Sequence, residues 1–280
     1  MEHCNITSAI VVYNKRICDS ITCRNIRNID SDIDILVLDN SEIKTNNEQY
    51  CRVNHIRYIS MEGNKGLSIA YNVAIDHSRN TDVIVLFDDD TEITAEYFEA
   101  LKKSLDEYPE IDIFAPIIRG QDGVIYSPNE FNFLRNHFIK SPDQIVSQDA
   151  FNAIASCLAI RMRVFENYRF NEKLFVDQVD QFFFYEQRKY GRKFGILNVI
   201  IRQNFYQRGA SLKADVGWRR LRLRIYDIFR HARLMGGGKY MLLAFIKCCG
   251  LGFQIGKKSK SPKVILKAGS LSCKLLFVDK

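Results

Sequence analysis

Short apolar runs alternate with segments of helical periodicity in the N-terminal part of the chain. Three runs rich in β-branched residues predict strands: residues 7–13, 33–38 and 55–60. Two segments that repeat apolar residues three and four positions apart predict amphipathic helices: residues 67–77 and 94–106. Asp19 is positioned to cap a further helix that extends to Asn28. Strands and helices that alternate in this way predict an α/β fold with a mostly parallel sheet.

The most apolar run of this part is residues 83–87 (VIVLF), which predicts a central strand buried on both faces. Ligands of parallel sheets bind at the carboxyl ends of the strands. Polar residues follow three of the predicted strands: Asn14, Asp39 and Asp88-Asp89-Asp90. The pattern therefore predicts a ligand site at this edge of the sheet.

The second half of the chain has a weaker pattern. Strand-like residues 111–125 precede a polar stretch, residues 127–148, for which we expect a long loop with room for one helical turn. Apolar residues then return in two segments, 151–160 and 170–195. Residues 218–234 predict a strongly basic helix, which Gly236-Gly237-Gly238 ends.

The composition is that of an ordinary globular protein of one or two domains, with 46% hydrophobic and 26% charged residues among 280. The longest apolar stretch, residues 241–255, is interrupted by Lys247 and by glycines, so we expect no transmembrane helix. The eight cysteines form no C-x-x-C pair, and the N-terminus shows no signal-peptide pattern. Both features predict a cytoplasmic protein.

The net charge of +7 hides two opposite regions. Residues 201–280 carry 18 basic and 3 acidic residues, a net charge of +15, whereas residues 1–200 carry 22 and 30, a net charge of −8. A basic C-terminal region predicts an anionic partner. A nucleic acid is one candidate, because arginines interleave with Tyr226 and Phe229.

Asp88, Asp89 and Asp90 are the sharpest chemical feature of the sequence. Three carboxylates at the end of a buried strand repel one another, and a divalent cation such as Mg²⁺ would offset that repulsion. The alternative is a solvated acidic turn that caps the next helix. Asp39 also has two interpretations. It can accept hydrogen bonds from a nucleobase or a ribose, or it can belong to a turn at the strand end.

Residues 63–68 (GNKGLS) precede a predicted helix, so their backbone N–H groups and Lys65 are suited to a diphosphate. Neither a G-x-G-x-x-G nor a P-loop motif is present. A second acidic cluster contains Asp177 and Asp180, which would share one face if both lay on a helix. Such a carboxylate, desolvated by nearby phenylalanines, suits a general base, although acidity at a helix N-terminus is the alternative.

In this order, the motifs resemble those of the family 2 glycosyltransferases, which are inverting enzymes that use nucleotide-sugars. The matching motifs are Tyr13-Asn14, Asp39, Asn64-Lys65-Gly66, Leu86-Phe87-Asp88-Asp89-Asp90 and the stretch 170–180. The last of them is most similar to rhamnosyltransferase-like bacterial members. The resemblance covers residues 7–234 and implies a GT-A-like, Rossmann-like fold with a basic helical C-terminal extension.

The resemblance also implies roles for individual residues. Those implied to bind the nucleotide-sugar are Tyr13, Asn14, Asp39, Asn64, Lys65, Gly66, Asp88 and Asp89. Asp88 and Asp90 would hold the cofactor, a divalent cation (Mg²⁺ or Mn²⁺), and Asp180 would be the catalytic base. The sequence departs from the family in two places. Ser156 replaces the usual glycine of the acceptor loop, and residues 202–209 lack the usual histidine, so an arginine or glutamine is expected to contact the phosphates.

Taken with the charge pattern, the resemblance predicts a catalytic domain over residues 1–214 and a basic helical region over 215–280. The expected partners are a nucleotide-sugar donor (dTDP-rhamnose or a UDP-hexose), a glycan or lipid-linked glycan acceptor, and an anionic membrane surface. The expected location is the inner face of the plasma membrane, and the expected role is synthesis of O-antigen or capsule. A nucleic-acid-binding protein is the alternative, and it would leave the acidic strand ends without a function.

Overall fold

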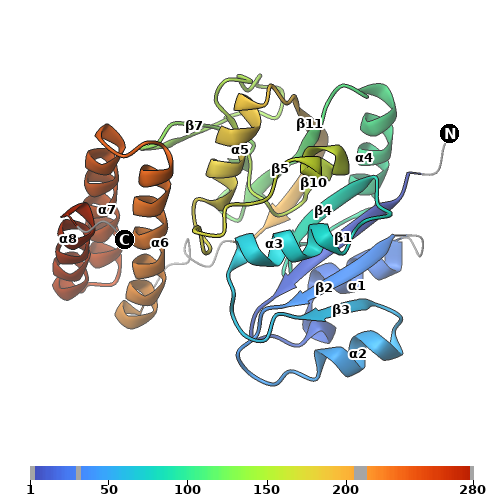
Figure 1. The fold of residues 1–280 in the computed structure, drawn as a ribbon, viewed down its shortest axis with the longest axis horizontal. Helices are drawn as coiled ribbons and strands as arrows, with labels where there is room; N and C mark the ends of the chain where they lie inside the picture. The colour runs from blue at the N-terminus through green and yellow to red at the C-terminus, as the bar shows by residue number, and fades with distance from the viewer. Residues whose placement is uncertain (1–3, 30–32, 205–212, 278–280) are drawn as a thin grey trace.

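The computed structural model describes residues 4–29, 33–204 and 213–277. Its centre is a sheet in which seven strands follow the order β11-β5-β10-β4-β1-β2-β3, and β6 pairs with β5 (Figure 1). The strands are β1 (Ile6–Val12), β2 (Asp34–Asp39), β3 (Arg57–Ser60), β4 (Val83–Asp88), β5 (Ile113–Gly120), β6 (Ile125–Ser127), β10 (Leu158–Arg161) and β11 (Phe194–Gln203). β1 to β4 pair in parallel, as do β5 and β11, whereas β6 and β10 run antiparallel to their neighbours. The predicted α/β class with a mostly parallel sheet is confirmed.

Helices cover both faces of this sheet. On one face lie α3 (Leu67–Asp76) and α5 (Val179–Lys189), and on the other lie α1 (Ile21–Ile29), α2 (Asn47–Val53) and α4 (Ala95–Glu107). The central strand β4 contributes side chains to both hydrophobic cores, which explains why its sequence is apolar without alternation.

Two local expectations are wrong. Asp19 does not cap a helix but closes a 3-10 turn over Ile17–Asp19, and the Ser20 hydroxyl accepts the Cys23 N–H at 3.1 Å instead. The polar stretch 127–148 contains strands β7 (Asn129–Phe131) and β8 (Asn136–Phe138), which form a small antiparallel sheet with β9 (Phe151–Asn152). Its polar residues lie in strands because this sheet is short and partly exposed.

The C-terminal part is a stack of three helices at one end of the molecule (Figure 1): α6 (Ala214–Leu234), α7 (Lys239–Lys258) and α8 (Pro262–Phe277). The expected basic helix is confirmed, and Gly236, Gly237 and Gly238 after it all adopt positive φ. The three helices have their own hydrophobic core, which also includes Phe133. In the part of the chain that the structure describes, no helix combines the length and apolar character that a membrane span requires.

Candidate active site

The carboxyl ends of three parallel strands converge at one edge of the sheet. β1 lies between β2 and β4, with Val12 in register with Asp39 and Val11 in register with Asp88. The two aspartates therefore flank the end of β1, where Tyr13 and Asn14 follow. The predicted convergence of these residues at one edge is confirmed.

Asp39 is a buried carboxylate that organises the loop after β2. Its Oδ2 accepts hydrogen bonds from Thr45 Oγ1, Asn47 Nδ2 and Tyr58 OH at 2.8–3.1 Å, and its Oδ1 accepts the Ser41 N–H at 3.1 Å. A carboxylate offers about four acceptor positions, so most of this capacity is used within the protein. Oδ1 is the atom with acceptor capacity left for a ligand.

Tyr13 and Asn14 fasten the same loop from the end of β1. The Tyr13 hydroxyl donates to Glu42 at 2.8 Å, and Asn14 Oδ1 accepts the N–H groups of Glu42 and Ile43 at 2.8 and 3.3 Å. Asn14 has a φ of 52°, a left-handed conformation that asparagine tolerates better than most residues. Tyr13 keeps an exposed ring beside this loop.

The segment Asn64-Lys65-Gly66 lies next to the β2 loop. Asn40 Oδ1 accepts the Lys65 N–H at 2.8 Å, and Asn40 Nδ2 donates to Asn64 Oδ1 at 3.2 Å. The Lys65 side chain is exposed. Gly66 directly precedes α3, as predicted. The exposed ammonium of Lys65 is therefore next to the N-terminus of this helix.

Asp88, Asp89 and Asp90 follow β4 as a turn. Burial, followed by the charges of Asp90 and Asp89, raises the pKa of Asp88 to about 6, and Gln203 Nε2 donates to its Oδ2 at 3.4 Å. Asp89 forms an ion pair with Lys15 at 3.1 Å. Burial raises the pKa of Asp89 as well, although Lys15 offsets part of the shift. Asp90 is exposed.

Asp180 lies in the first turn of α5, partly exposed and close to Asp88. Burial raises its pKa to about 7, and the charges of Asp177 and Asp88 add to the shift. Its own N–H and that of Ala155 oppose this shift by hydrogen bonding. The buried Tyr71 hydroxyl lies within the field of both Asp88 and Asp180. The structure therefore brings the two acidic clusters of the sequence together.

Asp177 and Asp180 do not share a helix, which was the condition for a common face, because α5 begins at Val179 and Asp177 precedes it. Gln178, between them, has a φ of 63° and turns the chain into the helix. Asp177 instead forms an ion pair with Arg224 of α6 at 3.2 Å and accepts Gln178 Nε2 at 2.7 Å. Burial raises the pKa of Asp177, but Arg224 and Gln178 outweigh it, so the net shift is downward.

Asp227, which no sequence motif marks, holds the segment before α5. This fully buried carboxylate of α6 accepts the backbone N–H groups of Phe175, Val176 and Asp177 at 2.8–3.0 Å, and pairs with Arg230 at 3.1 Å. Burial raises its pKa, and these donors offset part of the shift. A signal did exist, since Asp227 is the only acidic residue between Asp215 and Asp279.

Phe175 connects this segment to the loop before α3. Its N–H donates to Asp227, and its carbonyl oxygen accepts the N–H of Leu67 at 2.6 Å. Gly66 leaves room for this contact, because a Cβ there would lie 2.6 Å from the Phe175 carbonyl oxygen. The loop that carries Lys65 and helix α6 are therefore joined through one residue, Phe175, in the segment that leads into α5.

Ser156 replaces the expected glycine and lies behind Asp88. Its hydroxyl accepts the Asp88 N–H at 3.3 Å and shares a hydrogen bond with Thr91 Oγ1 at 2.9 Å. Of the stretch expected to contact phosphates, residues 205–209 lie outside the described residues. Gln203, which is described, does reach Asp88.

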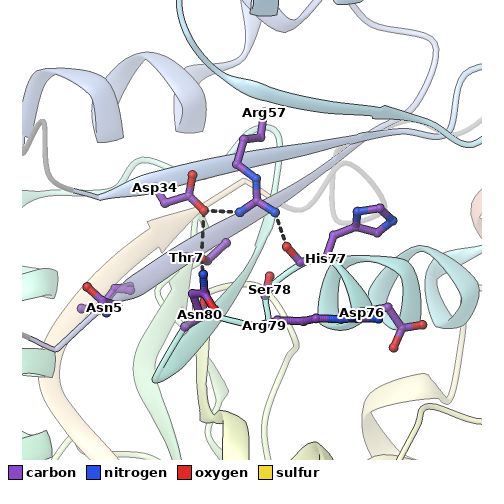
Figure 2. A pocket seen from close by; sticks show the side chains of 11 residues that line it. Asn5, Thr7, Asp34, Arg57, Asp76, His77, Ser78, Arg79 and Asn80 are labelled. Carbon is purple, nitrogen blue, oxygen red and sulfur yellow. Dashed lines mark hydrogen bonds and ion pairs between the residues drawn. The ribbon is translucent and has the colours of Figure 1, made fainter.

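A hollow of about 710 Å³ lies at the opposite end of the strands from these residues (Figure 2). Its lining includes Thr7 and Asp34, near the starts of β1 and β2, and His77 after α3. Arg57 donates there to Asp34 and to the His77 carbonyl. Its central cation is thus already paired, and the hollow lies far from the acidic edge that carries the candidate chemistry.

The residues around Asp88 and Asp90 show whether the expected divalent cation could bind there. Among the described residues, no group of three or more His, Cys, Asp or Glu side chains forms a ready-made metal site. Asp88 and the exposed Asp90 nevertheless fit a divalent cation, because burial and the neighbouring charges of Asp90 and Asp89 disfavour the ionised form of Asp88, and a cation would offset that cost. Phosphate oxygens of a ligand would supply further hard donors of the kind that Mg²⁺ and Mn²⁺ accept.

Comparisons with known proteins agree with this geometry. The sequence profile described as Glycosyl transferase family 2 matches residues 9–169. No curated protein matches the sequence. Solved structures are also similar to the chain, among them three with TM-scores above 0.5.

A structure of S. aureus TarS with UDP-GlcNAc has a TM-score of 0.54 and 13% identity, and covers 97% of this chain and 81% of that one. GalNAc-T7 with UDP, GalNAc and Mn²⁺ has a TM-score of 0.57 and 12% identity, with 96% and 58% covered. Glucosyl-3-phosphoglycerate synthase from Mycobacterium tuberculosis with Mn²⁺, UDP and phosphoglyceric acid has a TM-score of 0.56 and 13% identity, with 84% and 79% covered. At these identities the likeness concerns the fold.

Replacement of Asp227 tests whether α6 positions the site. Asp227→Asn keeps the shape but removes the charge that holds three N–H donors, so we expect the free energy of unfolding in urea to fall by about 2–3 kcal/mol. Displacement of Asp180 should lower kcat by about 10–100-fold. The matched control is Asp215→Asn, an exposed change on the same helix, which should stay within about 0.5 kcal/mol of the original protein. Equal behaviour of the two variants would remove the positioning role.

Proposed function

The chain belongs to glycosyl transferase family 2 and has the α/β GT-A-like fold of a nucleotide-sugar-dependent glycosyltransferase; from this premise we propose that it transfers a sugar, with inversion, to a hydroxyl group of a lipid-linked glycan. The observation that carries the proposal is the meeting of Asp180 with the Asp88–Asp90 turn at one sheet edge. A donor-side and an acceptor-side carboxylate cluster are both needed for this reaction. The proposed pathway is synthesis of a cell-surface polysaccharide such as O-antigen or capsule.

We place the nucleotide along the ends of β1 and β2. Asp39 Oδ1 is available for the nucleobase, and the exposed Tyr13 ring offers a surface for stacking. Lys65 and the N-terminus of α3 suit the diphosphate. TarS was crystallised with UDP-GlcNAc and GalNAc-T7 with UDP and GalNAc, which supports a UDP-hexose as the donor. The motif resemblance suggests dTDP-rhamnose, so these are the two donors to compare.

Asp88 and Asp90 would hold a divalent cation on the diphosphate. When bound, the cation would offset the negative charge that develops on the leaving nucleoside diphosphate. Lys15 lies beside this turn through its ion pair with Asp89. Because Lys15 already neutralises Asp89, the charge that is left for a cation is concentrated on the other two aspartates.

Asp180 is the proposed general base. The acceptor oxygen forms a bond to the anomeric carbon as the bond to the diphosphate breaks, its proton passes to the Asp180 carboxylate, and the diphosphate leaves with the electron pair. One displacement of this kind inverts the anomeric carbon and requires no covalent intermediate. A base with a pKa of about 7 can accept this proton near neutral pH while being stable as a carboxylate.

We also propose that the basic helical region, residues 215–280, holds the enzyme at an anionic membrane surface. One stripe of α7 exposes large apolar side chains at 52–60% of their full area: Leu242, Ile246 and Phe253. On α8, Leu266 and Phe277 are also exposed, as are Lys263, Lys267 and Lys274 of the same helix. Exposed apolar side chains among lysines suit a surface of anionic lipid.

Donor assays test the proposed reaction. With Mg²⁺ or Mn²⁺, we expect turnover of one nucleotide-sugar, measured as released nucleoside diphosphate, and loss of that turnover in EDTA. Asp180→Asn should lower kcat by about 10²–10⁴-fold while donor binding persists. Asp90→Ala should weaken metal binding and lower metal-dependent turnover. Glu92→Gln, an exposed neighbour, should change neither metal binding nor turnover. Full turnover of the Asp180 and Asp90 variants would exclude the mechanism.

The pH profile tests Asp180 as the base. Since the raised pKa keeps this carboxyl protonated in acid, kcat/KM should fall below about pH 7 and level off above it. Asp177→Asn removes a neighbouring negative charge and leaves Arg224 in place, so the acid limb should move to lower pH. An acid limb that stays in place in this variant would assign the titration to another group.

Vesicle sedimentation tests the membrane surface. Replacing Leu242 and Phe253 together by serine should weaken binding to anionic vesicles at least about tenfold, because two apolar side chains no longer enter the bilayer interface. The control replaces Val53 and Ile145, which are even more exposed but lie outside the C-terminal helices. If the two double variants sediment alike, the stripe on α7 is not the contact.

A further inference from the structure

A second cavity, of about 460 Å³, lies between the β7–β8 hairpin, α5, α6 and α7. Its volume falls within the range of about 300–1,000 Å³ that is typical of small-molecule sites. Most of its lining side chains are apolar or aromatic: Phe131, Phe133, Leu134, Tyr185, Met235, Tyr240 and Leu243. The cavity is distinct from the acidic edge of the sheet.

Polar groups occur at a few positions in this lining. Arg188 and Lys239 are cations, and among the residues that the structure describes no Asp or Glu lines the cavity. His231 is fully buried, its Nδ1 lies 3.1 Å from Gln178 Oε1, and its Nε2 has no hydrogen-bond partner among the described residues. An apolar cavity with cations and without carboxylates is complementary to an amphiphile with an anionic group.

The walls are held in place before any ligand binds. Lys247 of α7 donates to the Phe133 carbonyl at 2.8 Å, and its ammonium lies 5.2 Å from the Phe131 ring centroid and 5.5 Å from that of Phe133. The Phe133 ring also packs against Tyr240 at 5.5 Å. Because these contacts fix the hairpin on α7, the cavity is preorganised rather than formed on binding.

Two helices that line the cavity also carry the proposed base and the exposed apolar stripe. α5 carries the proposed base Asp180 in its first turn and contributes Tyr185 and Arg188 to the lining. α7 contributes Leu243 to the lining, whereas its next-door neighbour Leu242 belongs to the exposed stripe. A molecule that enters the cavity therefore lies between the exposed face of α7 and the helix of the base.

We propose that this cavity binds the phosphate and the first part of the apolar chain of the acceptor lipid, with Lys239 and Arg188 facing the phosphate. This inference rests on the proposed function, because it names how the lipid-linked acceptor is held. Geranylgeranyl phosphate represents such a lipid, because it joins one phosphate to an apolar chain that suits the apolar and aromatic walls. The sugar portion would then extend along α5 toward Asp180.

Calorimetric titration of the full chain with geranylgeranyl phosphate, below its micelle concentration, tests the proposal. Saturable binding of one molecule is expected, with weak or no binding of geranylgeraniol and of inorganic phosphate, since chain and phosphate are both required. Leu243→Trp should abolish saturable binding by filling the cavity, whereas Gln254→Trp, an exposed change on the same helix outside both the lining and the stripe, should preserve it. Lys239→Gln should weaken binding about fivefold, and Lys257→Gln, at the other end of the same helix, should leave it unchanged.

Nucleotide-sugar binding, measured on the same proteins, separates the possible failures. If all variants bind the donor but bind geranylgeranyl phosphate equally well, the lipid associates non-specifically and the cavity assignment is wrong. If the original protein binds the donor but not the lipid phosphate, the assignment is also wrong, while the proposed function stands. Absence of donor binding in the original protein would contradict the proposed function itself.

Discussion

The buried carboxylate of Asp227 is the interaction on which the arrangement of the active site depends. A single charge in the interior accepts three successive backbone N–H groups, and each of these donors would be costly to leave without an acceptor. Through them α6 fixes the segment that leads into α5. The same segment receives the N–H of Leu67, so one buried anion determines where the proposed base lies relative to the loop of Lys65.

The strands and the ends of the sheet could be predicted from the sequence because periodicity and burial dictate them directly. An apolar run such as residues 83–87 has few alternatives to a central strand, and in a parallel sheet its end must lie beside those of its neighbours. The small sheet of β7, β8 and β9 could not be predicted, because its strands are two or three residues long and partly polar. The short helix α2 likewise has too few residues to show a periodic face.

The candidate site was predictable where function requires a residue type at a strand end, and less so where tertiary contacts decide. Asp88 and Asp180 are far apart in sequence, and their proximity depends on how α5 packs on the sheet. The i,i+3 spacing of Asp177 and Asp180 suits a helix, but Gln178 turns the chain between them, and Asp177 forms its ion pair with Arg224. No local sequence motif marks Asp227, because the backbone N–H groups that donate to it lie some 50 positions earlier in the chain.

The three-donor contact to Asp227 also constrains how this family member can diverge. A C-terminal helix bundle with its own core looks like a module that evolution could replace without cost to the catalytic region. Here one of its helices supplies a ligand for the backbone of the active site, so an exchanged bundle must bring an acid at the same position. The bundle and α5, which carries the proposed base, are thus expected to be inherited together. If the bundle holds the acceptor as proposed, acceptor specificity should change by substitutions within it rather than by its replacement.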